Sequence, residues 1–201
     1  WVMALTGLGL VLFLIFHMIG NFHLYEGPRQ IGEYAEALRD IGGHLVPRTF
    51  LLWLLRIGLI LMFAFHIHAA YSLRAMGGRV SDDVGAVTGN KEYASKQDYI
   101  AANFASRTMR WTGPIIGLYI LFHLADLTIG WANPSFEHGH VYDNIIASLT
   151  RPWVAILYLV AQAAMAMHIF HGAWSLFQSL GSVNPKYKSL RRYFATGFAL
   201  F

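Results

Sequence analysis

The first 25 residues, WVMALTGLGLVLFLIFHMIGNFHLY, contain no Asp, Glu, Lys or Arg. A second stretch, residues 152–185, is equally free of these charged residues. Each stretch exceeds the roughly 20 residues that an α-helix needs to cross the hydrocarbon core of a bilayer. Of the 201 residues, 56% are hydrophobic and 13% are charged, whereas about a quarter are charged in a soluble domain. The sequence therefore predicts an integral membrane protein.

The expected fold is an all-α bundle of five transmembrane helices that forms a single membrane domain over residues 1–201. Helices are expected because lipid offers no partner to an unpaired backbone group. A short amphipathic pattern at about 29–42 predicts an interfacial helix. The chain begins with Trp1 and ends in an apolar run, so we expect a missing polar N-terminal tail and a truncated last helix. The five helices are expected at about 1–24, 49–75, 109–132, 151–179 and 191–201.

Positive charge alternates between the connecting segments. Residues 74–110 contain six Lys and Arg residues, and residues 179–192 contain four. In the alternate segments positive charge is weaker. Segment 25–48 has three arginines but also four acidic residues, and segment 131–151 has a single arginine. Because Lys and Arg collect on the cytoplasmic side of a membrane protein, we expect the first two segments, and with them the N-terminus, to be cytoplasmic.

The chain has no cysteine. This excludes disulfides, thiolate-bound iron–sulfur clusters, covalently attached c-type haem and cysteine nucleophiles. A phosphate-binding glycine motif and a dinucleotide fingerprint are also missing, and nothing suggests a nucleic-acid partner. Any metal must therefore rest on the ten histidines or on carboxylates, and we expect no catalytic residue in this chain.

Four histidines lie in four different predicted helices. Measured at about 1.5 Å per residue, His17 and His123 fall in the outer half of the membrane, whereas His66 and His168 fall in the inner half. A histidine at such depth is costly and usually functional. Because a haem iron can take one imidazole on each side, the two pairs predict two stacked bis-histidine haems that transfer electrons.

Several neighbours bear on this prediction. His171 shares part of the helical face of His168 and remains an alternative ligand, whereas His68 points away from the face of His66. Arg56, a charge within the second helix, is expected to pair with a propionate of the outer haem, with snorkelling to the interface as the alternative. Small residues near the ligands leave room for a flat porphyrin but also suit ordinary helix packing; they are Gly20, Ala69, Ala70, Gly113, Gly117, Ala164 and Gly172.

Two other functions remain open from the residues alone. A proton-coupled transporter could use the histidines as a relay, but such relays usually include buried acids, and only Asp126 lies near a membrane segment. A cytochrome b of another oxidoreductase class would place two histidines about 14 residues apart on one helix, and no predicted helix does so.

Four stretches resemble the single-polypeptide di-haem cytochrome b subunit of succinate dehydrogenases and fumarate reductases. The resemblance covers essentially the whole chain, and HGAWS and FHLADLT are its most specific parts. It implies that His17, His66, His123 and His168 are the haem ligands, and it selects His66 over His68 and His168 over its neighbour at 171. The stretches are FLIFHMIGNFHL (13–24), FHIHAAYSL (65–73), LYILFHLADLTIG (118–130) and MHIFHGAWSLFQSLG (167–181).

The resemblance also implies partners and cofactors. A flavoprotein with covalent FAD oxidises succinate, and an iron–sulfur subunit docks on the cytoplasmic loops. Two haems b then carry electrons to or from menaquinone in a bacterial cytoplasmic membrane. Some relatives carry a glutamate two residues before the fourth ligand, where this chain has Ala166, so that proton pathway is not implied here. The acids that could handle quinone protons are Glu33, Glu36 and Asp126.

Overall fold

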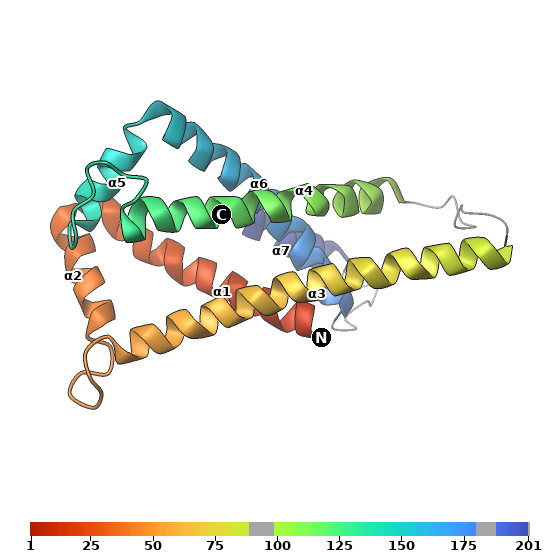
Figure 1. The fold of residues 1–201 in the computed structure, drawn as a ribbon, viewed down its shortest axis with the longest axis horizontal. Helices are drawn as coiled ribbons and strands as arrows, with labels where there is room; N and C mark the ends of the chain where they lie inside the picture. Colours follow the sequence, from red (N-terminus) through yellow and green to blue (C-terminus); the bar gives the residue numbers. More distant parts are fainter. Residues whose placement is uncertain (89–98, 180–187, 201) are drawn as a thin grey trace.

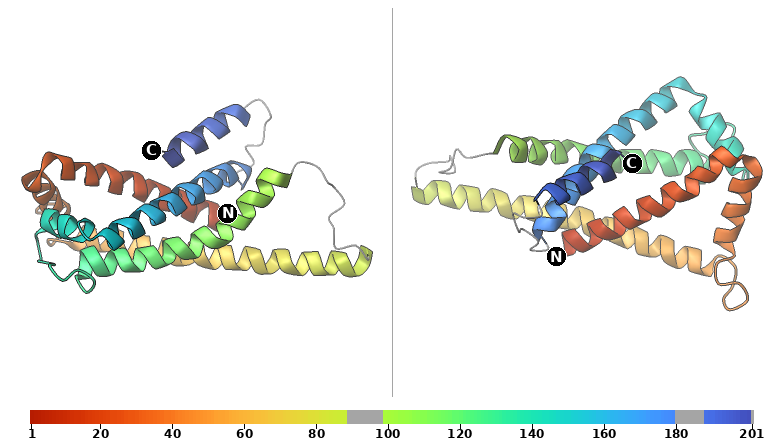
Figure 2. Two further views of the ribbon diagram at one scale, coloured as in Figure 1. Left: turned by 90° about the horizontal axis from the view of Figure 1, so that it is seen from above. Right: turned by 180° about the vertical axis from the view of Figure 1, so that it is seen from behind.

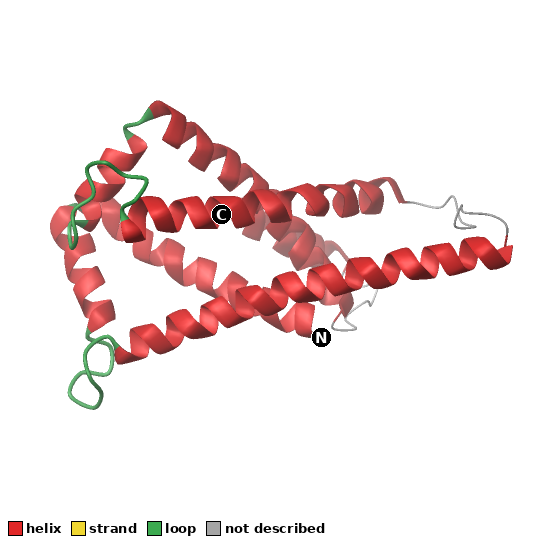
Figure 3. Cartoon of the chain, viewed as in Figure 1, coloured by secondary structure: helices red, strands yellow, loops and turns green. Residues whose placement is uncertain are grey.

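A computed structural model describes residues 1–88, 99–179 and 188–200, and the regular elements within these ranges are all helical (Figures 1 and 3). This agrees with the predicted all-α class. The helices are α1 (Val2–Phe22), α2 (Pro28–Arg39), α3 (Phe50–Thr88), α4 (Tyr99–Leu124), α5 (Val141–Leu149), α6 (Pro152–Ser179) and α7 (Lys188–Leu200), with a 3-10 turn η1 (His23–Glu26) after α1 and a π-helical turn η2 (Ala125–Ile129) after α4.

Four of the described helices are long and apolar enough to cross a membrane: the spans are Val2–Glu26, Phe50–Met76, Thr108–Ile129 and Pro152–Phe177. The protein is an all-α integral membrane protein. The predicted fifth span begins in α7, whose 13 described residues are too few to cross, so that span stays a prediction. Lys91, Lys96 and Lys186, which contribute to the predicted topology, lie outside the described residues.

Large apolar side chains point out of the bundle. Phe16, Leu118 and Leu159 are 66%, 69% and 69% exposed, and they lie on three different spans. A water-soluble monomer rarely shows so continuous an apolar surface, so these side chains face lipid. The buried apolar positions are mostly small: Ala4, Ala161, Ala164, Ala173 and Ala195 are all at most 7% exposed. Small residues let membrane helices approach closely.

The four spans form two packed pairs, and the pairs contact each other where α1 packs on α6. Helix α1 packs on α3, α4 packs on α6, and α1 also packs on α6 (Figures 1 and 2). Across the described residues, neither α1 with α4 nor α3 with α6 is among the closely packed pairs. These two diagonal pairs are therefore connected by side chains rather than by close backbone approach.

Two short helices cover one end of the bundle, which we call the α2/α5 end (left in Figure 1). Helix α2 lies over the stretch where an amphipathic helix was expected; it buries Ile31 and packs on α5. Its polar face carries ion pairs from Glu36 to Arg39 and Arg48. Helix α5 was not expected, because residues 131–151 were predicted to be a connecting loop.

Helix α3 is much longer than its span. Its 39 residues extend about 58 Å at 1.5 Å per residue, nearly twice the thickness of a hydrocarbon core of about 30 Å. The sequence predicted a helix only over 49–75, because charged residues follow. Beyond Met76 the helix continues to Thr88 and projects from the end of the bundle opposite α2 and α5 (Figure 1).

Candidate functional site

The first predicted pair of histidines meets between α1 and α4. The ring centroids of His17 and His123 are 6.0 Å apart and their planes are nearly perpendicular, at 88°. Phe13 stacks on His17 at 5.3 Å, one turn earlier on the same helix, and Tyr119 lies against His123 at 5.7 Å. The His17 side chain remains exposed although it faces another helix, so part of its ring is accessible.

The second predicted pair meets between α3 and α6. The ring centroids of His66 and His168 are 6.4 Å apart, with an interplanar angle of 64°. Each pair therefore joins one of the two diagonal helix pairs. The four histidines come together in the combination that their depths in the sequence predicted.

The two competing histidines lie elsewhere on the same helices. His68 is exposed. The His171 ring packs edge-on against Phe170, at 5.2 Å between centroids. Of the two histidines on α6, it is His168 that meets His66.

Three of the four paired rings make a hydrogen bond through Nδ1. His66 Nδ1 lies 3.2 Å from the Thr6 hydroxyl, and His123 Nδ1 lies 3.2 Å from the Tyr158 hydroxyl. His168 Nδ1 lies 3.2 Å from the hydroxyl of Thr112. In a neutral imidazole with Nδ1 protonated, Nε2 carries the lone pair, and such a ring is a metal ligand whose orientation the second contact sets.

The pair geometry fits two imidazoles on opposite sides of one metal ion. A metal–nitrogen bond of about 2.0 Å plus about 1.1 Å from nitrogen to ring centre separates two such centroids by roughly 6 Å. Within the described residues, however, no cluster of three or more His, Cys, Asp or Glu could hold a metal by itself. Two histidines suffice only if another group supplies the remaining ligands, as the four nitrogens of a porphyrin do.

Two glycines border the His66–His168 pair. A Cβ on Gly7 would lie 3.4 Å from Cε1 of His66, and a Cβ on Gly113 would lie 3.8 Å from Cε1 of His168. Even a methyl group at these positions would be in van der Waals contact with the rings. The donor set and this space therefore fit a flat, axially ligated group between the helices.

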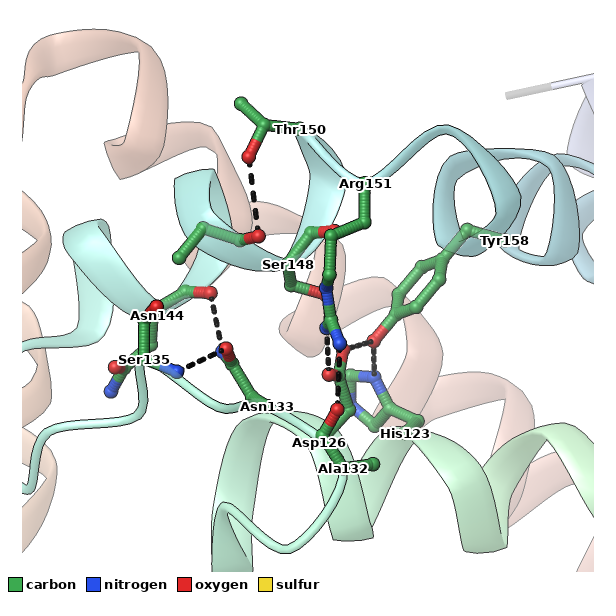
Figure 4. Close-up of polar contacts among 11 residues, drawn as sticks. His123, Asp126, Ala132, Asn133, Ser135, Asn144, Ser148, Thr150, Arg151 and Tyr158 are labelled. Carbon is green, nitrogen blue, oxygen red and sulfur yellow. Dashed lines mark hydrogen bonds and ion pairs between the residues drawn. The ribbon is translucent and has the colours of Figure 1, made fainter.

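A buried cluster of charged and polar side chains lies next to His123 (Figure 4). Asp126 is completely buried, and its carboxylate accepts hydrogen bonds from the Arg151 guanidinium and from the hydroxyls of Ser148 and Tyr158. Because the Tyr158 hydroxyl donates to Asp126, at 3.2 Å, its oxygen is left to accept from Nδ1 of His123. The cluster links the His17–His123 pair to α5 and to the start of α6.

Asp126 reaches this position through the π-helical turn. The turn Ala125–Ile129 follows α4 directly, and Gly130 ends it in the left-handed conformation, with φ of 91°. Such turns change the direction in which side chains point and are frequent at functional sites. The sequence placed Asp126 near a membrane segment, and the structure shows that this acid is completely buried.

Two buried asparagines hold the connection between η2 and α5. The side-chain amide of Asn133 donates to the backbone oxygen of Asn144 at 3.1 Å. The side chain of Asn144 in turn bonds both the backbone N–H and the backbone oxygen of Glu137, at 2.8 and 2.7 Å. These bonds tie the loop residues Asn133 and Glu137 to the first turn of α5.

Other predicted positions lie apart from the two pairs. Arg56 is exposed, and its guanidinium lies 5.1 Å from the ring centre of Trp53. Gly20, expected to make room for a porphyrin, instead lies under the Tyr34 ring. His23, for which no role was predicted, bonds Glu26 at 2.6 Å and packs on Tyr34, with the ring centroids 4.9 Å apart. The acids proposed for quinone protons at positions 33 and 36 are exposed and ion-paired with arginines.

The residues that sequence reasoning missed are Thr6, Thr112, Tyr158, Ser148 and Arg151. Each is polar or charged and lies on or next to a membrane span. A signal was available for two of them, because Thr6 and Thr112 each stand 11 residues before a predicted ligand. The others depend on contacts between helices that the sequence does not display.

A comparison with known protein families finds a match for about half of the chain. Residues 99–201 match the model of the succinate dehydrogenase/fumarate reductase transmembrane subunit. This range includes His123, His168 and the Asp126 cluster. Comparison with curated proteins and with solved structures gave no match. With four apolar spans and histidines facing one another between them, the chain belongs to the family of succinate dehydrogenase/fumarate reductase transmembrane subunits.

Proposed function

We propose that this chain is the di-haem membrane anchor of a succinate:menaquinone oxidoreductase in a bacterial cytoplasmic membrane. The observation that carries the proposal is the pair of facing imidazoles in each half of the bundle, with ring centroids 6.0 and 6.4 Å apart. His17 and His123 hold the outer haem b, and His66 and His168 hold the inner one. Haem b at these sites supplies one-electron transfer between the iron–sulfur subunit and menaquinone.

The chain's own part is to hold the two groups and keep them inert toward other ligands. A haem held by two histidines would transfer electrons without binding oxygen or substrate. The apolar spans around the pairs keep bulk water from the two sites. The chain thus provides a path across the membrane rather than an active site for a dicarboxylate.

The catalytic partners follow from the family and from the composition. The family is the transmembrane subunit of an enzyme complex, and this chain has no cysteine to bind a cluster, so we infer a flavoprotein and an iron–sulfur protein as its partners. In our proposal these partners, with FAD and the clusters, dock on the cation-rich segments 74–110 and 179–192. Positive charge on these segments indicates the cytoplasmic side and a cytoplasmic N-terminus.

Arg56 has a part in this proposal as well. Its guanidinium lies over Trp53 in the first part of α3, in the half of the span that precedes His66. A guanidinium has five N–H donors and suits a carboxylate. We assign it to a propionate of the outer haem, and replacement by Gln should shift the reduction potential of that haem alone.

A proton-coupled transporter is the second candidate, and one observation favours it. Asp126 is a fully buried acid that a hydrogen-bonded chain through Tyr158 connects to His123. Relays of this kind mark proton pathways in transporters. The ion pair with Arg151 argues against it, because a paired carboxylate in a fixed network is poorly suited to release its charge.

The deciding experiment is a pyridine haemochrome assay of the purified complex at known protein concentration, with a reduced-minus-oxidised spectrum. We expect two haems b per chain. One haem would mean that one of the pairs is structural. A colourless protein would refute the electron-transfer function and favour the transporter.

Single replacements then test each ligand. His17→Ala or His123→Ala should remove the outer haem only, and His66→Ala or His168→Ala the inner haem only. His171→Ala is the matched control on α6 and should keep both haems. Loss of a haem from the control with retention after His168→Ala would reverse the assignment on that helix.

A further inference from the structure

Each histidine of the inner pair is bonded to a threonine on the helix beside it. Thr6 on α1 lies 3.2 Å from Nδ1 of His66 on α3. Thr112 on α4 lies 3.2 Å from Nδ1 of His168 on α6. Both threonines are buried, at 9% and 5% exposure.

The direction of both bonds follows from the other contact of each hydroxyl. Thr6 Oγ1 donates its one hydrogen to the backbone oxygen of Val2, at 2.7 Å, with Met3 O at 3.3 Å as a weaker acceptor. Thr112 Oγ1 donates to the backbone oxygen of Thr108, at 2.9 Å. A hydroxyl has only one hydrogen, so its lone pairs face the imidazole and Nδ1 must donate.

The arrangement occurs twice because α1 and α4 repeat one another. Residues 6–17 read TGLGLVLFLIFH and residues 112–123 read TGPIIGLYILFH, with Thr, Gly, Leu, Phe and His in the same places. Eleven residues make close to three helical turns, so the threonine and the histidine of each stretch lie on one face, about 16 Å apart. Each of the two helices therefore contributes a ligand to the outer pair and a threonine to the inner pair.

Helix packing alone does not require this pattern. Threonines in membrane helices commonly bond the carbonyl four residues earlier, and that bond already satisfies the hydroxyl hydrogen. The additional contact with an imidazole, made by both threonines at the same distance and from equivalent positions, has no counterpart in such packing.

We propose that Thr6 and Thr112 are positioning residues for the inner haem: each accepts Nδ1–H from one ligand, fixes its tautomer and turns Nε2 toward the iron. The proposal rests on the proposed haem function. An acceptor on the second nitrogen makes an imidazole more basic, and a more basic ligand favours ferric over ferrous iron. The two threonines thus lower the reduction potential of the inner haem without touching the outer one.

The test is a redox titration of the purified complex with Thr6→Val or Thr112→Val, because valine keeps the shape and removes the hydroxyl. The inner-haem potential should rise in each variant, approaching about 59 mV for a tenfold change in ferric preference. The potential of the outer haem should stay constant. The two haems are distinguished by the single histidine replacements, which each leave one haem.

Two controls separate the hydroxyl from general effects. Thr6→Ser and Thr112→Ser keep the hydroxyl and should keep the wild-type potential. Thr150→Val makes the same change at an exposed threonine whose hydroxyl bonds a backbone oxygen, Ala147 O at 3.2 Å, and should change neither haem. If one valine variant does not assemble, the other tests the same contact on the opposite ligand.

The outcomes also distinguish this inference from the proposed function. A haem-loaded complex whose inner-haem potential is the same with Val as with Thr would overturn the role of the threonines and leave the di-haem function intact. Serine variants shifted as far as the valine variants would overturn it too. A wild-type complex without haem would overturn the function and this inference together.

Discussion

Replacing Asp126 with Ala should be among the most damaging single changes in the α2/α5 end. The carboxylate is completely buried and accepts three hydrogen bonds, from Arg151, Ser148 and Tyr158. Alanine would leave a guanidinium without its counter-charge and two hydroxyls without their acceptor. It would also release the tyrosine that holds His123.

The size of the effect can be worked from these contacts. Removing one partner of a buried ion pair costs about 3–5 kcal/mol. The lower end applies, because the Arg151 side chain is 20% exposed and still donates to the backbone oxygens of Ala132 and Ser148. Each hydroxyl left without an acceptor adds about 1 kcal/mol or more. We expect a loss of roughly 5 kcal/mol in the free energy of unfolding, which is a large part of the 5–15 kcal/mol typical of a folded domain.

The assay is denaturant unfolding of the purified complex in detergent, with a double-mutant cycle of Asp126→Ala and Arg151→Ala. Removing both partners should cost less than the sum of the single changes, with a coupling free energy of about 2–3 kcal/mol. The matched control is Asp143→Ala, an exposed carboxylate on α5 that lies 3.5 Å from His140. An exposed pair contributes about 0–1 kcal/mol. A loss at position 126 no larger than this control, or no coupling with position 151, would refute the reasoning.

Two further changes test the packing around the site. Gly20→Val should destabilise the protein by about 1–3 kcal/mol through overpacking, because a Cβ there would lie 2.6 Å from the Tyr34 hydroxyl and 2.7–2.8 Å from ring atoms; unchanged thermal stability would contradict this close contact. Asn144→Ala should cost about 1–3 kcal/mol, because it removes the two hydrogen bonds between the Asn144 side chain and the backbone N–H and oxygen of Glu137. Limited proteolysis should then cut residues 130–140 faster than in the wild type, and an unchanged rate would show that other bonds hold this connection.

The membrane fold could be predicted from composition and charge alone. Lipid removes every backbone partner except those within a helix, so an uncharged apolar run of sufficient length has only one stable form. For the same reason the depth of each histidine could be calculated from the helical rise, and the histidines meet in the pairs expected from those depths. Helix ends were predicted less well: α3 continues to Thr88, beyond the apolar run from which its span was predicted, and hydropathy detects only the part of a helix that lies in lipid.

Only the tertiary structure could show which side chains form hydrogen bonds with the paired histidines. Thr6 and Thr112 look like ordinary small polar residues in apolar helices until α3 and α6 bring imidazoles to within 3.2 Å. Asp126 looks like a helix-end acid until a π-helical turn brings it to Arg151. Burial along a helix is a property of one segment and can be deduced from its sequence. A hydrogen bond between helices depends on rotation and on atomic distance, which the packing of the whole bundle determines.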